Sequence, residues 1–253
     1  MKRSMYFVVA LLVVGGMNLA LHGDDARPAA AKDDKTNVAD EKGKEGSAAG
    51  VALLNQAGEL VQYARENESP LAMLTAVQII RRVPMQDGEE RVGEKQEEQA
   101  QGQARREGEQ RKDESAAAPS FDTKALLEEA REMAEGNEHV LALIDAEMKK
   151  PAQTGTLGAE SGPIVHRDSV RAITTDQYRI TFRGGEVARV AVIGDGDTDL
   201  DLYIIDENGN LITRDIDRTD RCVAEWTPRW TGVFLVRIQN LGLVHNNYVL
   251  MTN

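Results

Sequence analysis

The chain has 253 residues and a formal net charge of -12 at pH 7, with 42 acidic against 30 basic side chains. A chain of this length accommodates one or two domains of ordinary size, but long stretches without apolar side chains reduce the part that can fold around a core. The acidic excess repels polyanions, so it argues against nucleic acid and anionic membrane surfaces as partners.

The first 23 residues have the layout of a cleaved signal peptide. Lys2 and Arg3 form a basic start, residues 5–14 form an apolar stretch, and small residues follow. The alternative is an uncleaved membrane anchor, but the apolar stretch is shorter than the roughly 20 residues that span a bilayer, and Asn18 interrupts it. We therefore expect a secreted protein, periplasmic or extracellular, with no stable membrane span once the leader is removed.

The next two segments differ sharply in composition. Residues 24–48 are rich in Ala, Asp, Lys and Gly and are predicted to be a disordered spacer. Over 49–84 apolar residues recur at helical spacing and predict a helical hairpin whose first helix ends near Glu66. Ser69 is placed to cap the second helix, with Pro70 at its first position.

A charged, low-complexity insert separates this hairpin from a second one. Residues 85–120 lack an aliphatic stripe and are predicted to be disordered, with a charged helical interaction tail as the alternative. Helical periodicity returns over 121–150, where Asn137 is placed to cap a fourth helix. We expect the two hairpins to form a small bundle; the alternatives are tandem helical repeats and a dimer interface, which would make the chain a homo-oligomer.

Beyond a glycine-containing linker at 151–163, the pattern changes to strands. Apolar residues alternate with period two over 164–253, and Asn208-Gly209 is a strong hairpin signal. The predicted fold class is α+β, with helical hairpins or a small bundle followed by a C-terminal antiparallel β-sandwich. The strands with the clearest alternation are Tyr178–Phe182, Ala188–Val192, Leu200–Ile204, Phe234–Ile238 and Tyr248–Leu250.

The C-terminal region contains runs that resemble a known family. The run Gly194–Asn210 reads GDGDTDLDLYIIDENGN, and Trp226-Thr227-Pro228 precedes the strand Gly232–Ile238. Together they resemble the bacterial pre-peptidase C-terminal domain over about residues 165–253. The resemblance implies a jelly-roll-like, non-catalytic sandwich, often appended to secreted peptidases, with relatives that bind calcium, collagen or carbohydrate. Here helices and a charged insert stand where that family usually has a peptidase.

Six aspartates of this region are candidate calcium ligands, because carboxylates so close in sequence repel one another unless water or a cation screens them. The spacing is similar to an EF-hand loop, but Leu200 stands where that loop requires glycine and Asp206 where it requires glutamate, so we reject an EF-hand. The alternatives are a solvated acidic edge and, for Asp199 and Asp201, the capping of turn amides. The candidates are Asp195, Asp197, Asp199, Asp201, Asp215 and Asp217.

Aromatic residues offer a second candidate site. Trp230, Tyr203 and the neighbouring Arg229 are candidates for a surface that stacks on sugar rings, with core packing as the alternative for the aromatic side chains. Cys222 is the one cysteine in the sequence, which excludes an intramolecular disulfide, and its alternating surroundings predict a buried apolar role.

We expect no enzyme, because the four histidines share no metal-ligand spacing and no hydrolase, phosphate-loop or dinucleotide motif is present. Three functions follow as hypotheses. The first is a secreted accessory or scaffold protein. Its helical region would mediate association, and its sandwich would bind a macromolecule, such as an extracellular or envelope protein, or stabilise the exported chain. The second is a calcium-assisted module for carbohydrate or protein, with calcium as its cofactor and a glycan as the other candidate partner. The third is a remnant or regulator of a peptidase.

Overall fold

A computed structural model describes residues 35–88, 96–99, 121–151 and 162–253 of the chain. The expected leader, the first part of the spacer and most of the insert and linker lie outside the described residues. No helix in the four described ranges is long and apolar enough to cross a membrane.

Four helices precede the sandwich, and the predicted caps are confirmed. The Ser69 side chain accepts a hydrogen bond from the Ala72 amide at 3.4 Å, and the Asn137 side chain accepts one from the Val140 amide at 3.2 Å. Each bond satisfies an amide that the first helical turn leaves without a partner. The helices are α1 (Ala48–Glu66), α2 (Pro70–Ile80), α3 (Thr123–Met133) and α4 (Glu138–Met148).

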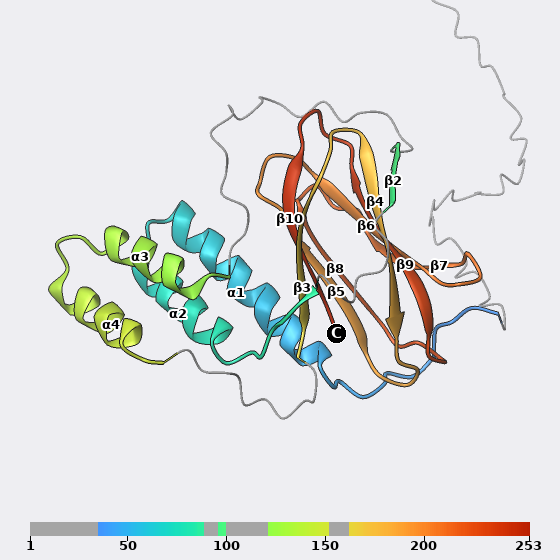
Figure 1. Cartoon of the computed structure of the whole chain (residues 1–253), viewed down its shortest axis with the longest axis horizontal. Helices are drawn as coiled ribbons and strands as arrows, with labels where there is room; N and C mark the ends of the chain where they lie inside the picture. Colours follow the sequence, from blue (N-terminus) through green and yellow to red (C-terminus); the bar gives the residue numbers. More distant parts are fainter. Residues whose placement is uncertain (1–34, 89–95, 100–120, 152–161) are drawn as a thin grey trace, which may run out of the picture. The chain divides into compact units, whose positions relative to one another are not determined.

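The C-terminal part is an antiparallel β-sandwich, as the sequence predicts (Figure 1). One sheet has the order β1-β3-β10-β5-β8 and the other β2-β4-β9-β6-β7. Counted from β3, the eight sandwich strands follow the orders 1-8-3-6 and 2-7-4-5, which is jelly-roll connectivity. The eight strands are β3 (Ile164–Val170), β4 (Thr174–Phe182), β5 (Ala188–Ile193), β6 (Leu200–Ile205), β7 (Leu211–Asp215), β8 (Arg221–Trp226), β9 (Gly232–Asn240) and β10 (Asn246–Thr252).

The predicted hairpin between β6 and β7 is confirmed. Gly209 has φ of +83°, a conformation that glycine adopts without steric cost. Its amide bonds to the Asp206 carbonyl at 3.0 Å and closes the turn. The sequence pattern did not single out β3 or β7, because β3 contains His166, Arg167 and Asp168 in its middle and β7 is a short edge strand.

The space between the two sheets holds a dense apolar core. Phe182, Trp226 and Phe234 pack edge to face or tilted, with ring centroids 4.8–5.8 Å apart. Cys222 is also buried there, and its thiol donates to the Leu200 carbonyl at 3.1 Å. The buried apolar role predicted for Cys222 is confirmed.

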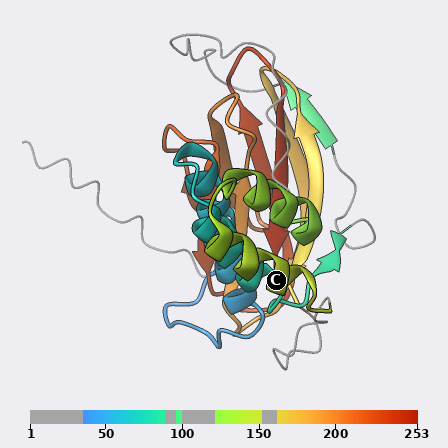
Figure 2. The same cartoon turned by 90° about the vertical axis from the view of Figure 1, so that its left-hand side faces the viewer.

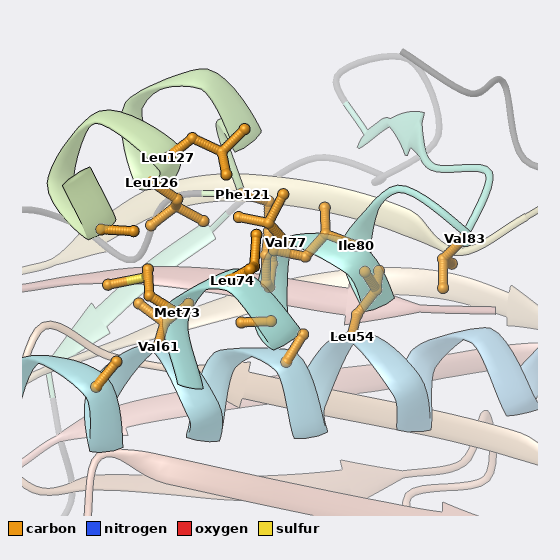
Figure 3. Packing of buried hydrophobic residues seen from close by; sticks show 14 of the residues in the cluster. Leu54, Val61, Met73, Leu74, Val77, Ile80, Val83, Phe121, Leu126 and Leu127 are labelled. Atoms are coloured by element: carbon orange, nitrogen blue, oxygen red, sulfur yellow. The ribbon is translucent and has the colours of Figure 1, made fainter. Parts of the chain in front are cut away.

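A second core joins the helices to the outer face of one sheet. Figure 3 shows its helical part, in which side chains of α1, α2 and α3, among them Leu54, Val77 and Leu126, lie between the helices. The same core contains five sheet residues, and full burial of a valine, isoleucine or methionine side chain contributes about 1.5–3 kcal/mol. These sheet residues are Val165, Ala191, Ile193, Val249 and Met251.

Helix α1 makes the contact with the sheet, and Figure 2 shows the four helices in front of the sandwich when viewed from the helical side. At Gly58 a Cβ atom would come within 2.3 Å of the Ile193 Cδ1 atom, so glycine lets the helix approach β5 closely. Arg189 of β5 fixes the start of α1 by donating to the Ala48 carbonyl at 2.6 Å.

This arrangement differs from a helical bundle separated from the sandwich by the predicted linker at 151–163, because the described helices and strands belong to one compact unit. The reason lies in strand β5. Its sequence, ARVAVI, carries apolar side chains on both faces, and the outer ones need a cover.

Two expected unstructured segments also contribute to the sandwich. Within the insert, β1 (Gln86–Asp87) pairs parallel with the start of β3, and β2 (Gln96–Gln99) pairs antiparallel with residues 174–177 of β4. Within the spacer, residues 35–47 run along one end of the sandwich to α1 (blue in Figure 1). Backbone hydrogen bonding to strand edges and loops needs no apolar side chains, which explains why composition did not indicate it.

The shared core makes a testable prediction. Ile193→Ala should lower the free energy of unfolding by about 2–4 kcal/mol, because it empties a site that both the sheet and α1 line. Val223→Ala, an exposed position on the neighbouring strand, should cost less than about 1 kcal/mol. Urea unfolding followed by helical circular dichroism and by tryptophan fluorescence should shift together in Ile193→Ala, since both tryptophans lie in the sandwich. Separate helical and sandwich transitions would contradict a shared core.

Candidate functional site

The structure places the candidate residues at opposite ends of the sandwich. Asp195, Asp197 and Asp199 lie in the β5–β6 loop and Asp217 in the β7–β8 loop, at one end. The β8–β9 loop, at the other end, carries Arg229 and Trp230. The remaining candidates, Asp201, Tyr203 and Asp215, lie on strands β6 and β7, so the set does not form one site.

Several of the aspartates accept hydrogen bonds from backbone amides. Asp195 Oδ2 accepts from the amide and the side chain of Asn247 in β10, both at 2.8 Å. Asp217 Oδ1 accepts from the Thr219 amide of its own loop at 2.8 Å, and Asp215 Oδ2 accepts from the Val223 amide of β8 at 2.9 Å. These contacts favour the binding of backbone amides as the role of the three carboxylates.

Other acidic side chains near this end of the sandwich are less exposed than a solvated acidic edge would require. Asp201 is 2% exposed and its Oδ2 atom lies 3.4 Å from the Tyr203 hydroxyl that donates to it. Asp220, which the spacing did not indicate, joins the same end by accepting from the Gly196 amide, and burial raises the pKa of its carboxyl. Across the described part of the chain, no three His, Cys, Asp or Glu side chains converge to hold a metal. Calcium binding stays a prediction.

Trp230 is held by the N-terminal segment rather than presented freely. Its amide donates to Asn37 Oδ1, and its carbonyl accepts from Asn37 Nδ2, each at 3.1 Å. The indole nitrogen donates to Glu207. Tyr203 instead lies within β6, opposite Arg237 of β9. Of the three candidates for a stacking surface, Arg229 and Trp230 are therefore the pair that shares a loop.

Asp206 anchors the same end of the sandwich. Its carboxylate accepts hydrogen bonds from the amides of Asn37, Asn208 and Asn210 at 2.8–2.9 Å. Burial opposes the charge, but these donors and the Asn210 side chain outweigh it and lower the pKa of Asp206 below its ordinary value of 3.8. The ionised carboxylate thus ties residues 35–47 to the β6–β7 hairpin.

A groove lies on the side of the sandwich where β3 and β4 face each other. This groove has a volume of about 330 Å³. Ile164 of β3 and residues 179–183 of β4 and its following turn line it, together with the start of β5. Ile180, Phe182 and Ala188 are its apolar residues from the sandwich core, and Arg179 and Arg183 bring positive charge.

One wall of the groove is a sheet edge. β2 covers residues 174–177 of β4, and β9 pairs with all of β4 on the opposite side. Within the described ranges, no strand pairs with residues 178–182 on the β2 side. The groove therefore runs beside backbone amides and carbonyls that can accept another strand.

A buried polar network continues along this side of the sandwich. The Tyr178 hydroxyl donates to Asp168 Oδ2 at 3.0 Å, the Tyr248 hydroxyl donates to Asp176 Oδ2 at 2.8 Å, and the two hydroxyls touch. Burial raises the pKa of both tyrosines above their ordinary value of 10.0. Phenols held neutral in this way stabilise the sheets and are poor bases or nucleophiles.

Comparisons with known proteins give limited similarity. No protein-family model and no curated protein matches the chain. Among solved structures, a mitogen from Yersinia pseudotuberculosis is 12% identical with a TM-score of 0.31, over 36% of this chain and 85% of that one. A periplasmic inhibitor of g-type lysozyme, PliG from Aeromonas hydrophila, is 12% identical with a TM-score of 0.27, over 36% and 84%.

The pre-peptidase C-terminal domain of a collagenase from Bacillus anthracis is 11% identical with a TM-score of 0.22, over 39% of this chain and 84% of that one. Similarity at this level identifies neither a family nor a function for the chain.

The lowered pKa of Asp206 predicts a pH dependence of stability. Asp206→Asn should cost about 1–3 kcal/mol at pH 7, because an amide nitrogen would face amide donors. A carboxyl with a lowered folded-state pKa stabilises the fold above its unfolded pKa and loses that contribution as pH falls through the folded value. The difference between wild type and variant should therefore shrink below about pH 4, as measured by urea unfolding from pH 7 to pH 2.5. Glu135→Gln, at an exposed position after α3, should stay within about 0.5 kcal/mol of wild type at pH 7.

The calcium hypothesis has a direct test, in which the hydrogen bonds of the aspartates favour little response to the ion. Millimolar calcium, compared with a chelator, should leave the melting temperature unchanged, because the carboxylates of Asp195, Asp215 and Asp217 already accept hydrogen bonds from neighbouring amides. Differential scanning calorimetry measures this directly. A calcium-dependent rise that Asp199→Asn abolishes would instead establish a metal site.

Proposed function

We propose that this chain is an exported, non-catalytic accessory protein whose β-sandwich binds a partner protein along the open side between β3 and β4. The observation that carries the proposal is the 330 Å³ groove beside an edge of β4 that no described strand covers along residues 178–182. A concave surface with a few convergent polar groups is the usual form of a binding site. The signal-peptide layout of residues 1–23 supports export.

The absence of catalysis is part of the proposal and rests on the state of the reactive groups. Burial raises the pKa of the Cys222 thiol, so the thiolate needed for attack is not formed near neutral pH. The tyrosines of the buried network are held neutral in the same way. Membership of the pre-peptidase C-terminal family is likewise a proposal, supported by the run Gly194–Asn210 and the strand that follows Trp226-Thr227-Pro228.

Site-specific crosslinking tests the binding role. A photo-reactive phenylalanine analogue in place of Thr181, an exposed residue of the groove, should crosslink a defined partner when the protein is expressed in its source cell. The same analogue in place of Arg214, exposed on β7 at the far edge of that sheet, is the matched control. Equal crosslinking at both positions, or none at Thr181, would count against a role of the open side.

Export is tested on the same material. The protein should be recovered from the periplasm or the culture fluid with a new N-terminus near residue 23. Mass spectrometry of the recovered chain gives this N-terminus. An intact leader on protein that stays in the membrane fraction would contradict export as a free protein.

A further inference from the structure

The β4 edge already accepts one extended segment of this chain. Residues Gln96–Gln99 pair antiparallel with Gln177–Thr174, and the pairing stops where the groove begins. The resident strand has the sequence QEEQ, so it carries acidic residues and no apolar ones. An extended acidic segment is therefore compatible with the first half of this edge, and the second half has the same strand geometry.

Two arginines and one glutamate lie beside the half of the edge that no described strand covers. Arg179 is exposed on β4, and Arg183, 74% exposed, lies 4.0 Å from Glu186 after the strand ends. An acidic side chain opposite Arg179 on an added strand would form a cross-strand pair. Glu186 also lines the groove and pairs with Arg183, so Arg179 is the side chain that favours an anionic occupant.

The alternation of side chains along β4 indicates which other residues a bound segment would need. Arg179 and Thr181 are exposed on the outer face, whereas Ile180 and Phe182 belong to the sandwich core and line the groove. Side chains of an added strand share the face of their neighbours on β4. Acidic residues would thus alternate with apolar residues that enter the groove.

We infer that the partner contributes an extended segment with alternating acidic and apolar residues, which adds to β4 antiparallel along residues 178–182. This inference rests on the proposed function, because it names what the open side binds. The main-chain hydrogen bonds provide affinity, and the arginines with the groove provide selectivity.

A synthetic peptide tests the inference on the full mature chain. The probe is a fluorescent nine-residue peptide with capped ends that alternates Glu and Val, and binding is measured by fluorescence anisotropy. We expect this probe to bind saturably. A peptide of the same composition, with its glutamates in one block, should bind at least tenfold more weakly. Methylation of alternate backbone nitrogens of the probe should abolish binding, because it removes the donors that a strand needs.

Charge reversal identifies the side of the sandwich. Arg179→Glu should weaken binding of the Glu-Val probe at least tenfold. The same variant should instead bind a probe that alternates Lys and Val. Arg214→Glu, at the far edge of the same sheet, is the matched control and should leave the affinity unchanged.

Hydrogen exchange separates the possible occupants. Without the probe, amides of residues 178–182 that do not bond to β9 should exchange quickly, and the probe should protect them. Protection before the probe is added, with no probe binding, would show that the chain or a second copy fills the edge and would overturn the inference. Crosslinking at Thr181 together with full binding of the methylated probe would overturn strand addition while leaving the proposed function standing.

Discussion

The apolar outer face of the β3-β10-β5-β8 sheet is the constraint on which the arrangement of this protein depends. A jelly roll needs an apolar interior, but here Ile193, Val249 and Met251 point away from that interior and are nevertheless fully buried. Exposing them would cost several kcal/mol, so the sheet requires a cover. Helix α1 supplies it, and the close approach at Gly58 shows how tightly the helix is fitted to β5.

The cover also determines the path of the rest of the chain. Since α1 begins where Arg189 bonds to Ala48, residues 35–47 must pass the end of the sandwich, where Asn37 and Asp206 fix them. Because α2 packs on α1, the chain that follows α2 lies beside β3, where it pairs as β1. Further along the chain, residues 96–99 pair with β4 as β2. Residues 85–88 and 96–99 of the charged insert thus lie at the open side as a consequence of helix packing.

The sequence predicted what depends on local periodicity and missed what depends on partners distant in the chain. Helix caps such as Ser69 and Asn137, the Asn208-Gly209 hairpin and the alternating strands were all readable because their determinants lie within a few residues. The shared core was readable in principle from the two-sided apolar run of β5 and of YVLM in β10, a signal of strands buried on both faces.

The candidate site was harder to predict, because its elements are backbone groups and shape. Nothing in the spacing of residues 178–182 distinguishes a strand with a covered edge from one beside a groove, since both faces alternate in the same way. The aspartates attracted attention because charge is visible in a sequence. Their hydrogen bonds to amides of Asn247, Thr219 and Val223 could be found from the fold alone.

The sheet edges on the two sides of the jelly roll are covered differently, and this difference bears on the binding proposed for the open side. On one side β7 and β8 are joined by a short loop, and Asp215 of β7 bonds to the Val223 amide of β8. On the other side β1 and β2 cover two and four residues of the edges. A strand of four polar residues gains main-chain hydrogen bonds but little apolar burial to offset its loss of chain entropy. A strand that also placed apolar side chains in the groove would gain the burial that QEEQ lacks, and this difference would provide free energy for the proposed binding at β4.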